Sequence, residues 1–229
     1  PVPDKRLKKL SYISDSKTTI PTYMDFVDIA GLVKGASVGE GLGNKFLAHI
    51  REMDVIAHVI RCFENSDVTH ISSSINPLRD IEIIETELKL ADLETLQNKF
   101  NSLQKKAKGD DKEIKSQLSL INSLLEIFNE SQLINFKDWS KEQLQMMNNL
   151  SLMTHKPMLY ICNVDEQSIA DGNNFSDLVK QKNQQEDKKT VLVSATIESQ
   201  IAQFDNTIDK LEILNELKLK ETTLKKVIN

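Results

Sequence analysis

The stretch that decides the fold is Tyr23-Met-Asp-Phe-Val-Asp-Ile-Ala-Gly-Leu-Val-Lys-Gly35. Its first six residues predict a short strand that ends in the carboxylate of Asp28, and Gly31 completes the pattern D-x-x-G. Glycine permits positive φ and lets the backbone approach a ligand closely. Ligands of open α/β sheets bind at the carboxyl ends of the strands. The cluster Gly31, Gly35, Gly39, Gly41 and Gly43 therefore predicts a ligand-binding loop at that edge.

Three further segments predict the rest of the sheet. Residues 55–62 form a nearly continuous apolar run, which is typical of a strand buried on both faces. Residues 157–163 and 190–194 predict two more strands, and residues 43–53 predict a helix. Strands separated by helical segments indicate parallel pairing. The expected fold class is therefore α/β, with a doubly wound, mostly parallel sheet.

The middle of the chain, residues 78–128, has the spacing of helices and no strand signal. Apolar residues recur every third or fourth position on both sides of residues 108–111, which predicts two helices with heptad seams in an antiparallel hairpin or coiled coil. A third helix is expected from the N-cap Ser140 to about Met153. The seam residues are Leu93, Leu96, Phe100, Leu103 and Ala107, then Ile114, Leu118, Ile121, Leu125 and Phe128.

These segments predict a helical insertion within an α/β domain. We expect a first part at residues 1–76, an inserted helical domain at 77–150 and a second part at 151–229. The net charge of −5 argues against a general nucleic-acid binder, although a local basic patch is compatible with it. The sequence predicts a cytoplasmic protein without a membrane-spanning segment. Cys62 and Cys162 are expected to be buried structural thiols.

Two polar motifs follow the last two predicted strands directly. Asn163-Val164-Asp165-Glu166 follows one, and Ser194-Ala195-Thr196 follows the other. An Asn at a strand end can bridge two loops and hydrogen-bond a purine, and a carboxylate three residues later can accept from guanine N1–H and N2–H₂. Asn163 in a local Asx-turn is the alternative. Asp28 is a candidate Mg²⁺ ligand, and the Gly31 amide a candidate donor to a γ-phosphate. The alternative there is a flexible loop in which Asp28 caps a turn.

Several segments together closely resemble the YchF / Obg-like ATPase family. They are residues 26–37, 39–46, 58–63, 80–88, 105–109 and 163–166. The resemblance implies a P-loop NTPase fold and a preference for ATP over GTP, which accompanies a base motif of the type N-x-x-E. It also implies that Asn163 and Val164 contact adenine, with Glu166 as the last residue of that motif. Ser194, Ala195 and Thr196 match the motif that supports the base.

The resemblance also implies how hydrolysis differs from that of related GTPases. Leu32 stands where many relatives have the Gln that orients the attacking water, and an apolar side chain cannot do this. His70 matches the family's candidate catalytic histidine, and an exposed loop histidine without a role is the alternative. Leu32, Gly35, Gly39, Gly41 and Gly43 form the implied switch segment, which loss of the γ-phosphate would release.

The resemblance places a basic tip on the helical hairpin, which includes Lys105, Lys106 and Lys108. RNA or the ribosome is the expected partner of such a tip. A solvated hairpin end is the alternative. We expect a monomer with ATP as substrate and Mg²⁺ as cofactor.

The sequence departs from the family pattern because G-x-x-x-x-G-K-[ST] does not occur in the 229 residues. The P-loop lies upstream of Pro1 in relatives, and a C-terminal TGS domain would follow Asn229, so we expect a fragment with weak or no nucleotide binding. Three functions stay open. They are an ATP-hydrolysing switch, a GTP-binding protein of the Obg type, and a non-enzymatic ribosome- or RNA-binding module.

Overall fold

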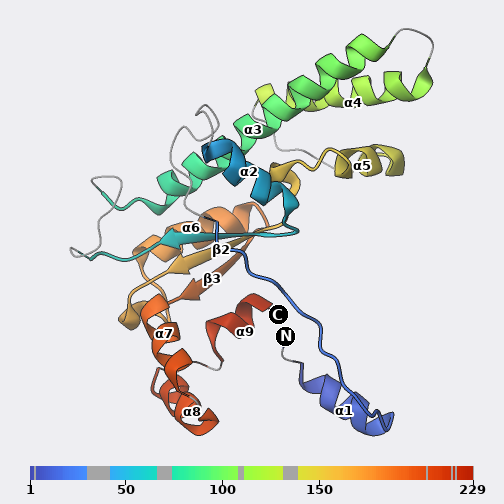
Figure 1. Ribbon diagram of the computed structural model, residues 1–229. Coiled ribbons are helices and arrows are strands. Elements are labelled where there is room, and N and C mark those ends of the chain that lie inside the picture. Colours follow the sequence, from blue (N-terminus) through green and yellow to red (C-terminus); the bar gives the residue numbers. More distant parts are fainter. Residues whose placement is uncertain are drawn as a thin grey trace. The chain divides into compact units, whose positions relative to one another are not determined.

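The computed structural model describes residues 1–229 except 3, 30–41, 66–73, 108–110, 131–138, 205, 218, 220 and 229. The chain divides into two compact units (Figure 1). The first comprises residues 1–28, 57–78 and 159–229, and the second comprises residues 29–56 and 79–158.

The described residues form a three-stranded sheet in the order β1-β2-β3, with β1 at Ile56–Arg61, β2 at Met158–Asn163 and β3 at Lys189–Val193. β2 and β3 are parallel, with Tyr160 opposite Thr190. The Ile56 N–H donates to the Pro157 carbonyl at 3.0 Å and the Cys62 N–H to the Asn163 carbonyl at 2.8 Å, so β1 runs in the same direction. The predicted α/β class is therefore confirmed, as are the predicted strands at residues 55–62, 157–163 and 190–194.

Helices of the first unit pack against β3. α6 (Asn174–Gln185) and α9 (Thr223–Ile228) both contact this strand. The buried Asn183 of α6 donates its Nδ2 to Thr190 Oγ1 at 2.7 Å. The Thr223 N–H at the start of α9 donates to Glu198 Oε1 at 2.6 Å, and Glu198 belongs to α7 (Ala195–Gln203). The first bond fixes the end of α6 against the start of β3, and the second joins α9 to α7. The remaining helices of this unit are α1 (Lys5–Ile13) and α8 (Thr207–Glu216), and η3 (Glu166–Ser168) is a 3₁₀ turn.

The predicted strand at residues 23–28 is wrong. This segment belongs to no sheet, and the side chains of Phe26 and Val27 are 58% and 52% exposed. Just before it, the Val2 N–H donates to the Thr22 carbonyl at 2.7 Å. An apolar segment becomes a strand only when a neighbouring strand accepts and donates its ladder hydrogen bonds. Within the described part of the chain no strand pairs with residues 23–28.

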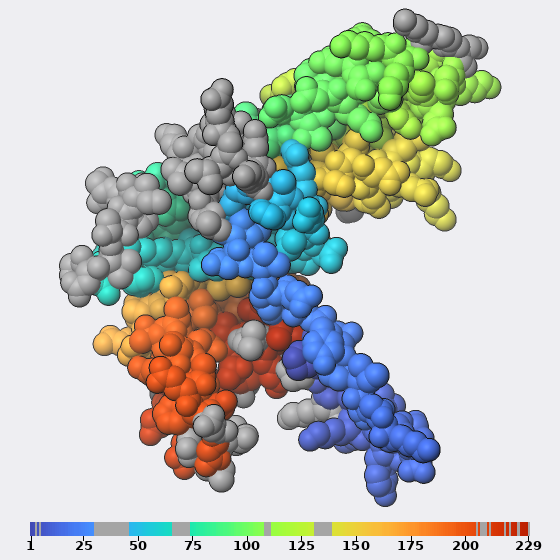
Figure 2. Space-filling view, viewed as in Figure 1, coloured from blue at the N-terminus to red at the C-terminus, as the bar shows by residue number. Residues whose placement is uncertain are grey.

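In the second unit, α3 (Pro77–Lys106) and α4 (Lys112–Asn129) lie side by side (Figure 1). Their apolar faces share one core with α5 (Lys141–Asn148), and the side chains of these helices are closely packed in Figure 2. The predicted seam residues other than Ala107 belong to this core or pack against it. The predicted helix bounds are thus confirmed, whereas the coiled-coil interpretation stays a prediction. The buried members are Leu96, Leu103, Leu120, Ile121, Leu124, Phe128, Met147 and Leu152.

The third predicted helix begins where expected and ends early. Ser140 forms a capping box with Gln143, since the Ser140 hydroxyl accepts from the Gln143 N–H and the Gln143 side chain accepts from the Ser140 N–H. The helix ends at Asn148 and not near Met153. Ser151 has a φ of 51°, which no α-helix can accommodate. A 3₁₀ turn, η2 (Met153–His155), follows.

A buried carboxylate joins α3 to that turn. Asp92 of α3 is fully buried and accepts hydrogen bonds from the Met153 N–H at 3.0 Å and from the Thr154 N–H and Oγ1–H, both at 2.8 Å. Burial raises the pKa of Asp92, and the three donors and the charge of Arg51 oppose this rise. α2 (Leu42–Glu52), which confirms the helix predicted at residues 43–53, packs against the same part of α3.

Candidate functional site

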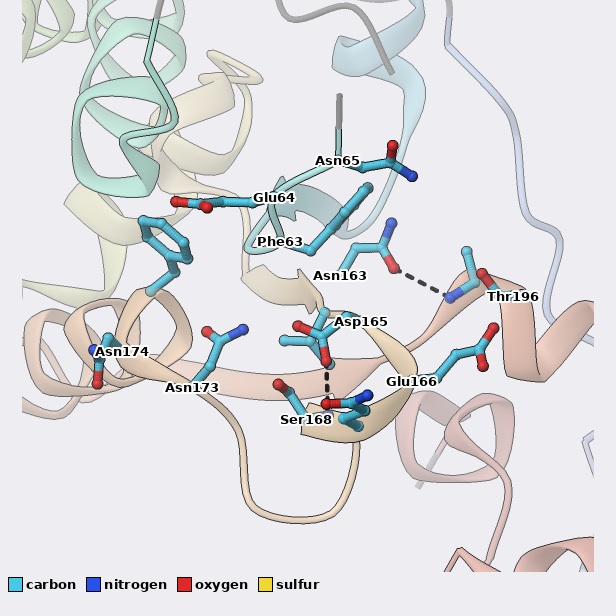
Figure 3. A pocket seen from close by; sticks show the side chains of 14 residues that line it. Phe63, Glu64, Asn65, Asn163, Asp165, Glu166, Ser168, Asn173, Asn174 and Thr196 are labelled. Carbon is cyan, nitrogen blue, oxygen red and sulfur yellow. Dashed lines mark hydrogen bonds between the residues drawn. The ribbon is translucent and has the colours of Figure 1, made fainter. Parts of the chain in front are cut away.

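A pocket of about 790 Å³ lies at the carboxyl ends of the three strands, within the first unit (Figure 3). Phe63 comes from the loop after β1, Asn163 is the last residue of β2, and Ala195 begins α7 after β3. This is the edge at which the sequence predicted ligand binding. The residues that line the pocket are Phe63, Glu64, Asn65, Asn163, Val164, Asp165, Glu166, Gln167, Ser168, Asn173, Asn174, Phe175, Ala195 and Thr196.

Asn163 bridges the two predicted polar motifs. Its Oδ1 accepts from the Ala195 N–H at 3.1 Å (Figure 3). The Val164 N–H donates to the Val193 carbonyl at 2.8 Å, so the backbone of the first motif is also fixed to β3. Because Oδ1 is engaged with the backbone, the amide of Asn163 offers its Nδ2 donor to a ligand. Asn163 therefore bridges the two loops, whereas its predicted hydrogen bond to a purine stays a prediction.

The carboxylates give the pocket a negative charge. Glu64, Asp165 and Glu166 line it, and no Lys, Arg or His is among its described lining residues. Asp165 caps η3 and accepts from the Ser168 N–H at 2.9 Å. Burial raises the pKa of Asp165, but hydrogen bonds from Ser168, its own amide and Asn173 outweigh this and lower it overall. A pocket of this charge favours a heterocycle with N–H donors and disfavours a polyphosphate.

One wall of the pocket was not predicted from the sequence. It is formed by the loop after β1 and by the start of α6, and it includes Phe63 and Phe175. Asn173 joins the two parts, since its Nδ2 donates to the Cys62 carbonyl at 2.8 Å while its Oδ1 accepts from the Ser176 N–H at 3.1 Å. The spacing of Asn173 and Ser176 is that of a capping box, which could have located the helix start from the sequence alone.

The second base motif contributes to the pocket only in part. Ala195 and Thr196 line the pocket at the first turn of α7. Ser194 is the N-cap of that helix, and its side chain is buried away from the described pocket lining. Ser194 thus supports the turn after β3, whereas its two neighbours face the cavity.

The other predicted site residues lie elsewhere. Asp28 is exposed and is not among the described residues that line the pocket, and Gly43 lies in α2 of the second unit. Lys105 and Lys106 are exposed at the end of α3. No group of three or more His, Cys, Asp or Glu side chains suited to a metal occurs in the part of the chain that the structure describes. The predicted residues that fall outside the described ones are Gly31, Leu32, Gly35, Gly39, Gly41, His70 and Lys108.

Comparison with known proteins gives a consistent result. Residues 10–99 match the family model described as 50S ribosome-binding GTPase. The chain is 46% identical over 228 residues to "Ribosome-binding ATPase YchF" of Pasteurella multocida, covering 100% of this chain and 62% of that protein. It is 41% identical over 229 residues to the protein of the same name from Bacillus subtilis, covering 99% and 62%. It is 42% identical over 166 residues to "Obg-like ATPase 1" of Oryza sativa subsp. japonica, covering 72% and 42%.

A solved structure agrees with these matches. The YchF GTPase of Schizosaccharomyces pombe superposes with a TM-score of 0.82 at 29% identity, covering 99% of this chain and 62% of that one. The parallel sheet, the polar loops at its carboxyl edge and this superposition define an α/β domain of the P-loop GTPase type. Within that class, the chain belongs to the YchF / Obg-like ATPase family. It spans about 62% of the length of the YchF relatives it matches.

No helix in the described ranges is long and apolar enough to cross a membrane. Both cysteines are free and buried, as the sequence predicted.

Proposed function

We propose that this chain belongs to a ribosome-associated nucleotide hydrolase that prefers ATP and uses the nucleotide as a switch. The observation that carries the proposal is the Asn163–Ala195 hydrogen bond at 3.1 Å, which joins the loops after β2 and β3 into the edge proposed to bind the base. The names of the relatives supply the association with ribosomes and the hydrolase activity.

The preference for adenine over guanine is proposed from the resemblance to the family and from the acceptors at the pocket. Asn163 Nδ2 can donate to purine N7, which both bases share. The bases differ at C6, where adenine carries an NH₂ donor and guanine carries an oxygen acceptor. Glu64 and Asp165 line the pocket as acceptors, so they suit the adenine amino group and repel guanine O6. Glu166, the residue that would read guanine N1–H and N2–H₂, lines the same pocket on the α7 side (Figure 3), so a comparison of ATP with GTP decides between the two bases.

Phe63 supplies an apolar surface for the base. Its ring lines the pocket opposite the first turn of α7 (Figure 3). Stacking on an aromatic ring contributes affinity for any base, whereas the polar groups of the edge supply the discrimination. The proposed site therefore recognises the base through Asn163, the backbone of Val164 and the Phe63 ring.

Hydrolysis of the β–γ phosphoanhydride is the activity proposed, with ATP as substrate and Mg²⁺ as cofactor. His70 is the candidate for orienting the attacking water, because Leu32 cannot do so. Asp28 is the candidate Mg²⁺ ligand, and in the described residues it belongs to no group of three or more His, Cys, Asp or Glu side chains suited to a metal. The proposed assembly is a monomer located in the cytoplasm.

The test is a titration of the chain with ATP and GTP, followed by backbone amide NMR. Because the 229 residues lack G-x-x-x-x-G-K-[ST], we expect a weak Kd for ATP, on the order of 0.1–1 mM. Shifts should cluster at residues 163–166 and 194–196, and GTP should bind at least several-fold more weakly. Asn163→Ala should abolish these shifts, whereas the matched control Asn101→Ala, on the exposed surface of α3, should not. Equal or tighter GTP binding, or shifts confined to other residues, would refute the proposal.

A further inference from the structure

Several side-chain contacts hold the loop that follows β1, up to residue 65, in one position. Arg61, the last residue of β1, donates its Nε to the Phe63 carbonyl at 3.2 Å and its Nη2 to the Asn65 carbonyl at 3.0 Å. Its guanidinium carbon lies 4.8 Å from the centroid of the Phe63 ring. One side chain therefore contacts two carbonyls and the aromatic face of the same short loop.

Two further bonds fix the beginning of this loop. The Cys62 N–H donates to the Asn163 carbonyl at 2.8 Å, which ties the loop to β2. The Cys62 carbonyl accepts from Asn173 Nδ2 at 2.8 Å, which ties it to the start of α6. The backbone is thus held at residues 62, 63 and 65 before any ligand arrives.

We infer that Arg61 is a positioning residue that braces the Phe63–Asn65 loop and fixes the Phe63 ring as a preformed platform in the base pocket. The inference rests on the proposed function, because it assigns the platform to a nucleotide base. Arg61 is not among the described residues that line the pocket, so it acts through Phe63 and the two carbonyls. A ring that is already fixed loses less freedom when a base stacks on it, so binding is tighter.

An arginine is suited to this task for a geometric reason. The planar guanidinium carries five donors in a fixed fork and can lie flat on an aromatic ring while its edge donates to carbonyls. A lysine offers a point charge on a flexible stem and cannot make the flat contact and both bonds together. The substitution Arg61→Lys should therefore weaken the contacts of residue 61 with the Phe63 ring and the two carbonyls, and it leaves the net charge unchanged.

The experiment measures the Kd for ATP of the full chain and of Arg61→Lys, Arg61→Met and Phe63→Leu. We expect both Arg61 variants to bind about 5- to 10-fold more weakly, which is the size expected for losing one cation–π contact and a charge-assisted hydrogen bond. Arg6→Lys is the matched control, because Arg6 is 85% exposed and pairs with Asp4 far along the chain from the pocket residues. Circular dichroism and the thermal midpoint identify any variant that fails to fold. If Arg61→Met does not fold, the Kd of Arg61→Lys decides the test.

A double-mutant cycle separates positioning from a general loss of stability. If Arg61 acts through the Phe63 ring, adding Arg61→Lys to Phe63→Leu should weaken ATP binding by less than about 2-fold. A second readout needs no nucleotide. Hydrogen exchange of the Cys62 amide, which is bonded to the Asn163 carbonyl, should become about 10-fold faster in both Arg61 variants because the loop opens more often.

The outcomes are distinguishable. If wild-type chain binds ATP and both Arg61 variants bind it equally well, the inference is overturned and the proposed function stands. Full additivity with Phe63→Leu, or unchanged exchange at Cys62, overturns it as well. If the wild-type chain binds no nucleotide even at millimolar concentration, the base site proposed for these residues fails, and exchange of the Cys62 amide alone decides whether Arg61 holds the loop.

Discussion

Replacement of Asp92 tests whether one buried carboxylate holds α3 to the 3₁₀ turn at residues 153–155. In Asp92→Ala the buried Met153 N–H loses its acceptor, which costs about 1–3 kcal/mol. Thr154 is exposed, so water can replace the acceptor for its two donors. Adding about 1 kcal/mol for the lost packing of a core side chain gives an expected destabilisation of about 2–4 kcal/mol. Asp92→Asn keeps one acceptor oxygen and should cost about 1–2 kcal/mol.

The assay is urea unfolding, followed by far-UV circular dichroism and by the fluorescence of the single tryptophan. That residue, Trp139, packs against the helical core of the second unit, so it reports on the unit that contains Asp92. Glu94→Gln is the matched control, because Glu94 is an exposed carboxylate on the same helix. If both Asp92 variants unfold within about 0.3 kcal/mol of the wild type, the carboxylate is not the anchor that its hydrogen bonds indicate.

The dependence on pH tests the electrostatic side of the same site. Burial raises the pKa of Asp92 above its ordinary value of 3.8. Between that value and the folded pKa, the native state holds a proton that the unfolded chain has lost, so the stability contributed by Asp92 falls as the pH rises. The difference in unfolding free energy between wild type and Asp92→Asn should therefore be larger at about pH 4 than at pH 7. A difference that grows with pH would show that the three donors outweigh burial and would contradict this reasoning.

Two further predictions concern the pocket wall and the basic end of α3. Gly172 has a φ of 87°, and a Cβ there would lie 2.6 Å from Ser176 Oγ. Gly172→Ala should therefore destabilise the chain by about 1–3 kcal/mol, measured by thermal unfolding. Asp171→Ala, at the neighbouring residue, is the control and should have little effect. Replacing Lys105 and Lys106 by Ala should lower cosedimentation with ribosomes at low salt, with the difference lost at high salt. Unchanged pelleting at low salt would show that this end of α3 is not the contact.

The sequence predictions were correct where the interacting residues are close together in the sequence. The seam at Leu96, Leu103, Ile121 and Phe128 could be read from spacing because two helices joined by a short connection bury the stripes that their own periodicity creates. The Ser140 cap is equally local, since donor and acceptor are three residues apart. The end of that helix was missed because the positive φ at Ser151 has no signal in the residue type.

The strand predicted at residues 23–28 failed because strand formation is not local. Apolar residues favour a strand, but the hydrogen bonds must come from a partner strand elsewhere in the chain. Phe63 and Phe175 could not be assigned to the site for a similar reason. They are far apart in sequence, and the Asn173–Cys62 bond joins their segments at one wall.

Asn163 was predictable because its role depends on chain order and on the geometry of parallel strands. Motifs that directly follow two neighbouring parallel strands must meet at one edge, and the observed bond to Ala195 joins them there. The chemical character of the pocket was less accessible, since it depends on Glu64, which no motif indicated. Together with Asp165 it makes the pocket rich in hydrogen-bond acceptors. A triphosphate is usually bound with the help of cationic side chains, and the described lining of this pocket contains no Lys, Arg or His.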